Sequence, residues 1–329
     1  MEDKIYIFGH KNPDTDSVCA AISLSYLKNK QGLNTEPRIL SSINDETKYV
    51  LNKFKFKVPE ELHDVKLQLK DVNYHKGFCI SEKESIYNAF KFMQENGMST
   101  VPVVDKNGKF CGSFAMKDIA KNEILRDVIS LKTSYDHLMN TLNGKELLRF
   151  NDEIEGNVTT VDYRSSTFAM HMLFNNKTIL VVGDRHSIIE YAVNKRVGTI
   201  VITGDNEIKT EHLEIAKKNK INVIQTSKTS LEVIYKIMFS NYIENFNFVE
   251  QFVCADEDIY LSDLDDIILN TKHSYYPVID SSNKCLGLLK LSDLNDKKPK
   301  QVILVDHNES TQSVEGLEEA EIVGVVDHH

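Results

Sequence analysis

The chain has 329 residues and a formal net charge of −10, with 41% hydrophobic and 27% charged residues. This length and composition are ordinary for a globular protein of two or three domains, and the acidic balance argues against nonspecific binding to nucleic acid or to acidic membranes. No apolar run approaches the roughly 18 residues of a membrane span. The five cysteines are scattered without a C-x-x-C pair, so we expect reduced thiols and a cytoplasmic protein that binds neither membrane nor nucleic acid.

The N-terminal stretch predicts a strand, a loop and a helix. The apolar run at residues 5–8 predicts a buried strand, and a helical pattern begins near Ser17. The loop between them contains His10, Asp14 and Asp16. At the carboxyl end of a strand in an α/β sheet, where ligands bind, such side chains suit a divalent ion, with manganese or magnesium favoured by carboxylates. The alternative is that the two aspartates only cap the helix and the histidine lies in a surface loop.

In the C-terminal stretch, a predicted strand leads directly into Asp and His residues twice. Apolar runs at residues 302–305 and 322–326 predict two more buried strands. The first leads into D-H-N-E at residues 306–309, and the second leads into D-H-H at residues 327–329. Three strands that each deliver Asp or His to the same edge favour a metal site over isolated capping residues.

These motifs carry a resemblance to a known family. The stretch G-H-x-N-P-D-x-D from Gly9, V-D-H-N-E from Val305 and D-H-H from Asp327 resembles the DHH phosphoesterase superfamily, and within it the manganese-dependent family II inorganic pyrophosphatases. The resemblance implies hydrolysis of pyrophosphate at a site with two ions, Mn²⁺ or else Co²⁺ or Mg²⁺. It places six residues there: His10 and Asp14 at one ion, Asp16 and His328 at the second, Asp306 as a bridge, and His329 facing the phosphate.

A parallel sheet built from both ends of the chain requires a large insertion. Residues 1–60 are expected to form the first part of the DHH domain, with a second strand at 37–40 and a second helix at 46–54. Residues 299–329 are expected to form the second part. The fold class is therefore α/β, with an incomplete parallel-sheet DHH domain interrupted by domains that fold on their own.

The insertion contains an internal repeat. Residues 97–118 align without gaps on residues 272–293, and each copy predicts helix, strand, turn, strand and a short helix near an Asp. One such copy cannot bury its apolar face alone, so two copies should pair. The pattern resembles the CBS domain, with copies expected at 61–127 and 246–298, and the resemblance implies a homodimer and a binding site for an adenine nucleotide (AMP, ADP or ATP).

The CBS resemblance also suggests nucleotide-binding residues. Asp118 and Asp293 match the ribose-binding carboxylate of the family. The family usually has a hydroxyl residue three positions earlier, where this chain has Ala115 and Lys290, and Lys290 could replace the phosphate contact electrostatically. Tyr276 could stack on adenine, although an aromatic residue beside a proline on a strand is as often part of the core.

Strands alternate with helices between the two CBS copies. Strands are predicted at 178–182, 199–202 and 223–224, and helices at 187–195, 210–219 and 229–241, which indicates a small parallel sheet. The tripeptide at 183–185 resembles the DRTGG domain that some CBS-containing family II pyrophosphatases carry, although H-S-I stands in place of T-G-G. Residues 128–245 are expected to act as a spacer or dimerisation domain rather than a second nucleotide site.

The resemblance covers essentially the whole chain. The family continues past D-H-H with a further metal-binding Asp and a domain whose Lys and Arg residues bind the substrate, so the resemblance implies little hydrolytic activity for these 329 residues. Two alternatives remain at this point. One is a catalytically inactive adenine-nucleotide sensor, and the other is a DHH phosphoesterase acting on short oligonucleotides or cyclic dinucleotides.

Overall fold

The computed structural model describes residues 4–124, 130–161, 173–246, 252–306 and 310–327. The chain divides into two compact units. The first consists of residues 1–76, 253–281 and 287–329, and the second consists of residues 77–252 and 282–286. Among the described residues, no helix combines the length and the apolar character needed to cross a membrane.

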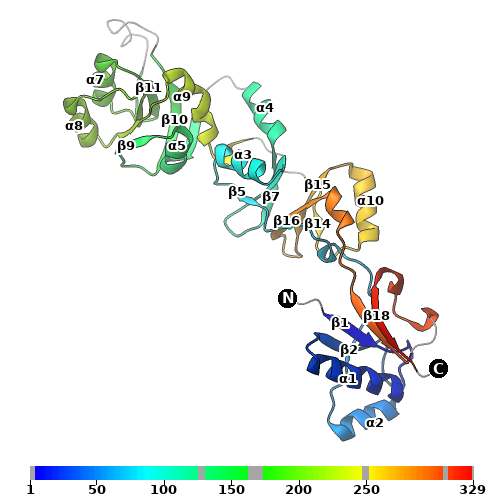
Figure 1. Cartoon of the computed structure of the whole chain (residues 1–329). Helices are drawn as coiled ribbons and strands as arrows, with labels where there is room; N and C mark the ends of the chain where they lie inside the picture. The colour runs from blue at the N-terminus through cyan, green and yellow to red at the C-terminus, as the bar shows by residue number, and fades with distance from the viewer. Residues whose placement is uncertain (1–3, 125–129, 162–172, 247–251, 307–309, 328–329) are drawn as a thin grey trace. The chain divides into compact units, whose positions relative to one another are not determined.

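The first unit contains a five-stranded sheet made from both ends of the chain. Its order is β18-β17-β1-β2-β3, and every neighbouring pair is parallel. The strands are β1 (Ile5–Phe8), β2 (Thr35–Ile39), β3 (Glu60–Glu61), β17 (Gln301–Val305) and β18 (Glu321–Val326). Figure 1 shows the blue N-terminal strands beside the orange and red C-terminal strands. The predicted parallel α/β sheet interrupted by an insertion is therefore confirmed.

Two helices and short 3₁₀ turns surround this sheet. The helices are α1 (Thr15–Lys30) and α2 (Asp45–Phe54), and the turns are η5 (Ser310–Gln312) and η6 (Leu317–Glu319). A further turn, η1 (Leu69–Asp71), lies in the connection to the insertion. One face of the sheet packs against α1, where Ile7, Ala21 and Ile303 share a core. The other face packs Phe8 and Val302 with side chains from the loops on either side of the insertion. Burial on both faces fixes β1 and β17 in the middle of the sheet.

The two CBS copies have the same element order. The second copy contains β14 (Ala255–Asp256), α10 (Leu261–Thr271), β15 (Tyr275–Ile279), β16 (Cys285–Lys290) and η4 (Leu291–Asn295), with β4 (His75–Lys76) antiparallel to β16. The first copy contains β5 (Ile80–Ser81), α3 (Ile86–Glu95), β6 (Thr100–Val104), β7 (Phe110–Ala115) and α4 (Met116–Ile124).

The spacing between the copies is constant. The long strands begin at 100 and 110 in the first copy and at 275 and 285 in the second, an offset of 175 residues in both cases. The helix before them also shifts by 175, from 86 to 261. The predicted gap-free repeat is confirmed by these bounds. The copies differ at their ends, where α4 is an α-helix and η4 is only a 3₁₀ turn.

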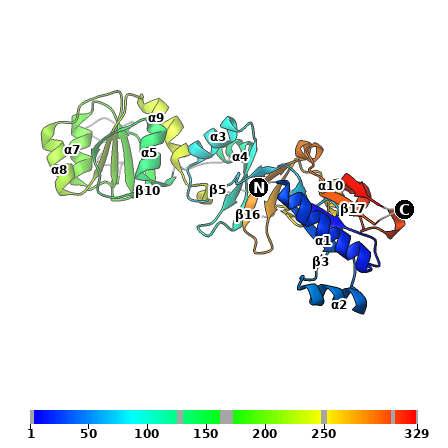
Figure 2. The same ribbon diagram turned by 60° about the horizontal axis from the view of Figure 1, so that its bottom comes forward.

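The second unit also contains a six-stranded sheet of order β8-β10-β11-β12-β13-β9. Its strands are β8 (Ser130–Ser134), β9 (Lys145–Leu148), β10 (Glu153–Thr159), β11 (Thr178–Val182), β12 (Thr199–Ile202) and β13 (Asn222–Gln225). Its helices are α5 (Tyr135–Leu142), α7 (His186–Asn194), α8 (Thr210–Lys218) and α9 (Ser230–Ile237), followed by η2 (Met238–Ser240) and η3 (Ile243–Asn245). Figure 2 shows α7 and α8 on one face of the sheet and α5 and α9 on the other.

The prediction for this sheet was incomplete. Strands β11, β12 and β13 are parallel, as expected, and β10, which was not predicted, is parallel to β11. The edge strands β8 and β9 are antiparallel to their neighbours and were not predicted. The sheet is therefore mixed, with an antiparallel strand at each edge of a parallel centre.

Candidate functional site

Three parallel strands end at the same edge of the five-stranded sheet. Phe8 at the end of β1 lies beside Leu304 of β17, and Val305 lies beside Val326 of β18. The next residues of the three strands therefore leave the sheet together. The Asp306 N–H donates to the Val326 carbonyl over 3.0 Å, so the exit of β17 is tied to that of β18.

Three predicted ligands converge at this edge. The Nε2 atom of His10 lies 3.4 Å from Oδ2 of Asp306 and 3.8 Å from Oδ2 of Asp14. One donor atom from each residue lies within 4.8 Å of the other two. An octahedral ion with bonds of about 2.1 Å separates adjacent ligands by about 3 Å and opposite ligands by about 4 Å, so these donors fit one divalent ion after small side-chain movements.

Asp14 caps α1 with one carboxylate oxygen and faces His10 with the other. Its Oδ1 accepts a hydrogen bond of 2.9 Å from the Ser17 N–H, which caps the N-terminus of α1. Its Oδ2 is the oxygen that faces His10. Asp14, and not Asp16, is therefore the N-cap of α1. Its second oxygen is free of this bond, and its role as a metal ligand stays a prediction.

Backbone geometry brings these side chains together. A Cβ atom on Gly9 would lie 1.8 Å from Oγ of Ser17 and 3.0 Å from the carbonyl oxygen of Val305, so only glycine lets α1 approach β1 and β17 this closely. Asp306 has a φ of +48° in the left-handed region, which is uncommon for residues other than glycine but is adopted more often by Asp. Such strained positions gather at functional sites.

Among the described residues, the predicted ligand Asp16 is not part of this cluster. Asp16 lies in the first turn of α1 and is exposed. Burial, and secondly the charge of Asp16, raises the pKa of the Cys19 thiol. His328, the predicted partner of Asp16, and His329 lie outside the described residues. The second ion therefore stays a prediction.

The two CBS aspartates have equivalent local partners. Oδ2 of Asp118 accepts from the Ala115 N–H, and Oδ2 of Asp293 accepts from the Lys290 N–H, both over 2.9 Å. Asp118 is buried, and Oδ2 of Asp293 lies 3.7 Å from Nε2 of His75. The residue three positions before each Asp thus contributes its backbone N–H, whichever side chain it carries. This common geometry is a structural reason for an Asp at the end of each copy, besides the predicted contact with ribose.

Tyr276 is fully buried. Its hydroxyl lies 2.8 Å from Oγ1 of Thr271, and its ring meets that of His273 edge-on. This is the core environment that the sequence left as the alternative to stacking on adenine.

No motif predicted a group of lysines that lines a cavity in the first unit. Its members lie at positions 4, 70, 76, 298 and 300. They are too far apart in the sequence to form a pattern, and the local signal for them is the run K-K-P-K at residues 297–300.

Comparison with known domains identifies the insertion. The DRTGG domain model matches residues 137–238, and the CBS domain model matches residues 69–124 and 246–298. A crystal structure of the CBS and DRTGG domains from the regulatory region of Clostridium perfringens pyrophosphatase, complexed with the activator diadenosine tetraphosphate, superimposes with a TM-score of 0.63. It is 24% identical and covers 68% of this chain and 100% of its own, which shows the same fold.

The similarity to characterised families extends over the whole chain. A cobalt-dependent inorganic pyrophosphatase from Clostridium perfringens is 33% identical over 100% of this chain. A probable manganese-dependent inorganic pyrophosphatase from Thermotoga maritima is 27% identical over 99% of it. This is a CBS- and DRTGG-containing protein with a parallel sheet whose edge gathers His and Asp. Its sequence is similar over its whole length to metal-dependent inorganic pyrophosphatases, and it spans about 60% of the length of these two relatives.

Proposed function

We propose that this chain provides metal ligands for a pyrophosphate-hydrolysing site whose activity responds to adenine nucleotides bound by the CBS copies. The convergence of His10, Asp14 and Asp306 at one sheet edge carries the proposal. The names of the two relatives support Mn²⁺ or Co²⁺ as the ion. A mixed imidazole and carboxylate donor set is compatible with either metal.

Each ligand has a distinct role in this proposal. His10 offers an imidazole nitrogen, and Asp306 offers a largely buried carboxylate whose position is set by its unusual backbone conformation. Asp14 brings a second carboxylate from the start of α1. Divalent ions held here would act as Lewis acids toward phosphoryl oxygens. Asp16 and His328 complete the proposed set as ligands of a second ion, and His329 is proposed to face the phosphate.

Metal titration tests the proposed centre directly. Calorimetry with Mn²⁺ and with Co²⁺ should show binding to the native chain and a loss of at least tenfold in affinity for His10→Ala and for Asp306→Asn, because even the loss of an outer-shell partner typically costs about 10–100-fold. His63→Ala and Asp45→Asn are matched controls, since both residues are exposed and lie outside the cluster. Equal affinity in the native chain and both cluster variants would refute the centre.

The nucleotide part of the proposal concerns the two CBS copies. The diadenosine tetraphosphate in the similar regulatory region supports a ligand with adenine and phosphate groups. Asp118 and Asp293 are proposed to accept hydrogen bonds from ribose hydroxyls, with Lys290 near the phosphates of the second site. Carboxylate contacts of this kind are worth about 1.5–3 kcal/mol each.

Asparagine substitutions isolate that contribution. Asp118→Asn and Asp293→Asn keep an oxygen for the local backbone N–H and remove the charge. Calorimetry with AMP, ADP, ATP and diadenosine tetraphosphate should show roughly a tenfold or greater loss of affinity in at least one variant. Asp263→Asn, an exposed residue of α10, is the control. Unchanged affinity in both site variants would exclude the ribose contact.

A homodimer is proposed from an apolar groove in the second unit. The groove has a volume of about 430 Å³ and is lined by side chains of α3, α4 and the η2 region, among them Phe90, Met116, Ile119 and Phe239. Apolar grooves of this kind favour association, and a second copy of the chain is the proposed partner. Sedimentation of native chain and of Phe90→Lys should give a dimer and a monomer, respectively, and a monomeric native chain would contradict the proposal.

A further inference from the structure

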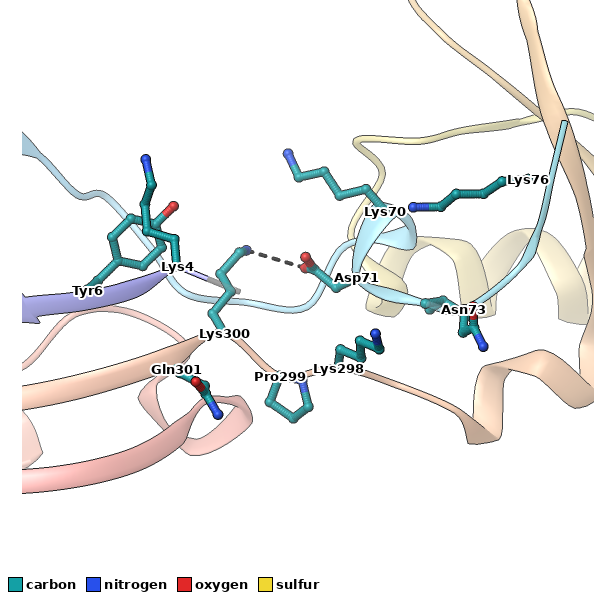
Figure 3. Close-up of a pocket in the computed structure, with 11 residues that line it drawn as sticks. Lys4, Tyr6, Lys70, Asp71, Asn73, Lys76, Lys298, Pro299, Lys300 and Gln301 are labelled. Atoms are coloured by element: carbon teal, nitrogen blue, oxygen red, sulfur yellow. Dashed lines mark ion pairs between the residues drawn. The ribbon is translucent and has the colours of Figure 1, made fainter. Parts of the chain in front are cut away.

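A cavity in the first unit is lined by lysines from three separate segments of the chain. It has a volume of about 320 Å³, which falls in the range of about 300–1,000 Å³ found for small-molecule sites. Lys4 precedes β1, Lys70 and Lys76 come from the segment that leads into the insertion, and Lys298 and Lys300 come from the segment that returns from it. Figure 3 shows these five side chains around the cavity with a single acidic side chain, Asp71.

Carboxylates balance only part of this positive charge. Nζ of Lys4 lies 2.5 Å from Glu36, and Nζ of Lys70 lies 2.6 Å from Asp258. Lys300 donates to the Lys66 carbonyl and lies 3.5 Å from Asp71. Within the described part of the chain, Lys76 and Lys298 form no ion pair, and the ammonium of Lys76 lies over the Tyr74 ring.

The backbone holds the two connecting segments together. The Lys298 N–H donates to the Asp71 carbonyl over 2.8 Å, and the Asn73 N–H donates to the Asp296 carbonyl over 3.1 Å. Val72 and Lys297 form an antiparallel bridge between them. Main-chain hydrogen bonds therefore hold together the two segments that carry Lys70, Lys76, Lys298 and Lys300. The lysine side chains themselves remain flexible.

The cavity lies away from the candidate metal centre. Lys4 and Tyr6 belong to the start of β1, and Lys300 and Gln301 belong to the start of β17. The metal cluster follows the opposite ends of the same parallel strands. Four or five residues at about 3.3 Å each separate the two edges by roughly 13–17 Å, so one small ion cannot occupy both sites.

We propose that this cavity is a second anion site, which binds a phosphate group at the two connections between the sheet and the insertion. Like charges held close together repel, and a multiply charged phosphate relieves that repulsion while accepting hydrogen bonds from several ammonium groups. Inorganic phosphates and the phosphate chain of a nucleotide share this chemistry. A bound phosphate bridges Lys76 on the outgoing connection and Lys298 on the returning connection.

Binding of inorganic anions to the metal-free full chain tests the site. Calorimetry in the presence of a chelator uses inorganic phosphate, pyrophosphate and tripolyphosphate as probes, with ATP and adenosine as the nucleotide arms. The native chain should bind at least one inorganic anion, and the Lys76→Gln/Lys298→Gln double variant should lose at least tenfold in affinity. Higher ionic strength should weaken the binding, because exposed charges are screened by salt.

Two further variants make the result specific. The arginine pair Lys76→Arg/Lys298→Arg keeps both charges and should keep the affinity within a few fold. The pair Lys217→Gln/Lys218→Gln removes two exposed lysines of α8 and should have no effect. A parallel loss of ATP affinity in the glutamine pair, with adenosine binding unchanged, identifies the nucleotide as one source of the phosphate.

The outcomes are separable from those of the metal centre. Mn²⁺ titration of the glutamine pair should match that of the native chain, so failure of one site does not imply failure of the other. Absence of binding by all three inorganic anions overturns the proposal. So does equal affinity in the native chain and in the glutamine pair.

Discussion

Gly9 shows how a single residue controls the approach of α1 to the sheet. Its missing Cβ leaves room for Ser17 and for the carbonyl oxygen of Val305. We expect Gly9→Ala to lower the free energy of unfolding of the first unit by about 1–3 kcal/mol, the usual cost of overpacking. Urea unfolding is the measurement. Gly324→Ala is the control, because its new methyl group would meet Ile303 at an ordinary 3.7 Å, and an equal effect of both substitutions would contradict the explanation.

Glu84 carries a pH-dependent contribution to stability in the second unit. Burial alone would raise the pKa of its carboxyl group, but hydrogen bonds to Oε1 outweigh burial and lower the pKa to about 2. Nε2 of His137 and the Ser85 N–H both lie 2.8 Å from this oxygen. Because the folded pKa lies below the ordinary value of 4.5, this stabilisation is present above pH 4.5 and is lost as the pH falls toward 2.

The pH profile of stability measures this contribution. Between pH 6 and pH 3 the native chain should lose about 1–2 kcal/mol more than Glu84→Gln, after allowance for partial solvent screening. Glu214→Gln, at an exposed position of α8, should follow the native profile. Parallel native and Glu84→Gln profiles would show that Glu84 has no such role.

The sequence predicted those residues of the candidate site that follow the ends of parallel strands. His10 and Asp306 are 296 positions apart, yet parallel strands that precede both residues predict one shared edge, and the structure brings their side chains to 3.4 Å. The positive φ of Asp306 could not be predicted, because it depends on the hydrogen bond from its N–H to β18. The lysine cavity also escaped prediction, because its charges meet only after both connections have paired.

At the scale of elements, α1 begins at Asp14, which caps the helix and faces His10. Asp14→Ala removes both the cap and the carboxylate that faces His10, and should cost about 1 kcal/mol of stability without metal. Asp14→Asn keeps a capping oxygen and should cost only a few tenths of a kcal/mol. Both variants should lose at least tenfold in Mn²⁺ affinity, because both remove the charged oxygen.

A second helix supplies the control for this prediction. Asn44 caps α2 by accepting from the Thr47 N–H over 2.8 Å, outside the metal cluster. Asn44→Ala should therefore lower stability like Asp14→Ala and leave Mn²⁺ affinity unchanged. Urea unfolding and calorimetry on the same four proteins separate capping from metal binding. Full Mn²⁺ affinity in Asp14→Asn would assign Asp14 to capping alone.

Repeated elements were predicted better than isolated ones. The 175-residue offset that aligns Asp118 with Asp293 also relates the strands and the first helix of each copy, because one sequence pattern specifies one local fold. The strand β9 has the sequence K-E-L-L and packs only part of its residues against the core. Such a short strand is specified by its pairing with β13, which lies about 75 residues later in the chain.

The whole molecule consists of two units, and the candidate metal centre belongs entirely to the first. A ligand that binds only the folded state at 100 times its dissociation constant stabilises that state by about 2.7 kcal/mol. Mn²⁺ should therefore slow hydrogen exchange at β1 and β17 by up to about a hundredfold. The same ion should leave exchange at β11 and β12 of the second unit nearly unchanged. The double variant His10→Ala/Asp306→Asn should abolish the slowing at β1 and β17, because it removes the ligands without changing either core. Equal slowing in the native chain and in the double variant would mean that the ion binds elsewhere, and would exclude a centre at the edge of the five-stranded sheet.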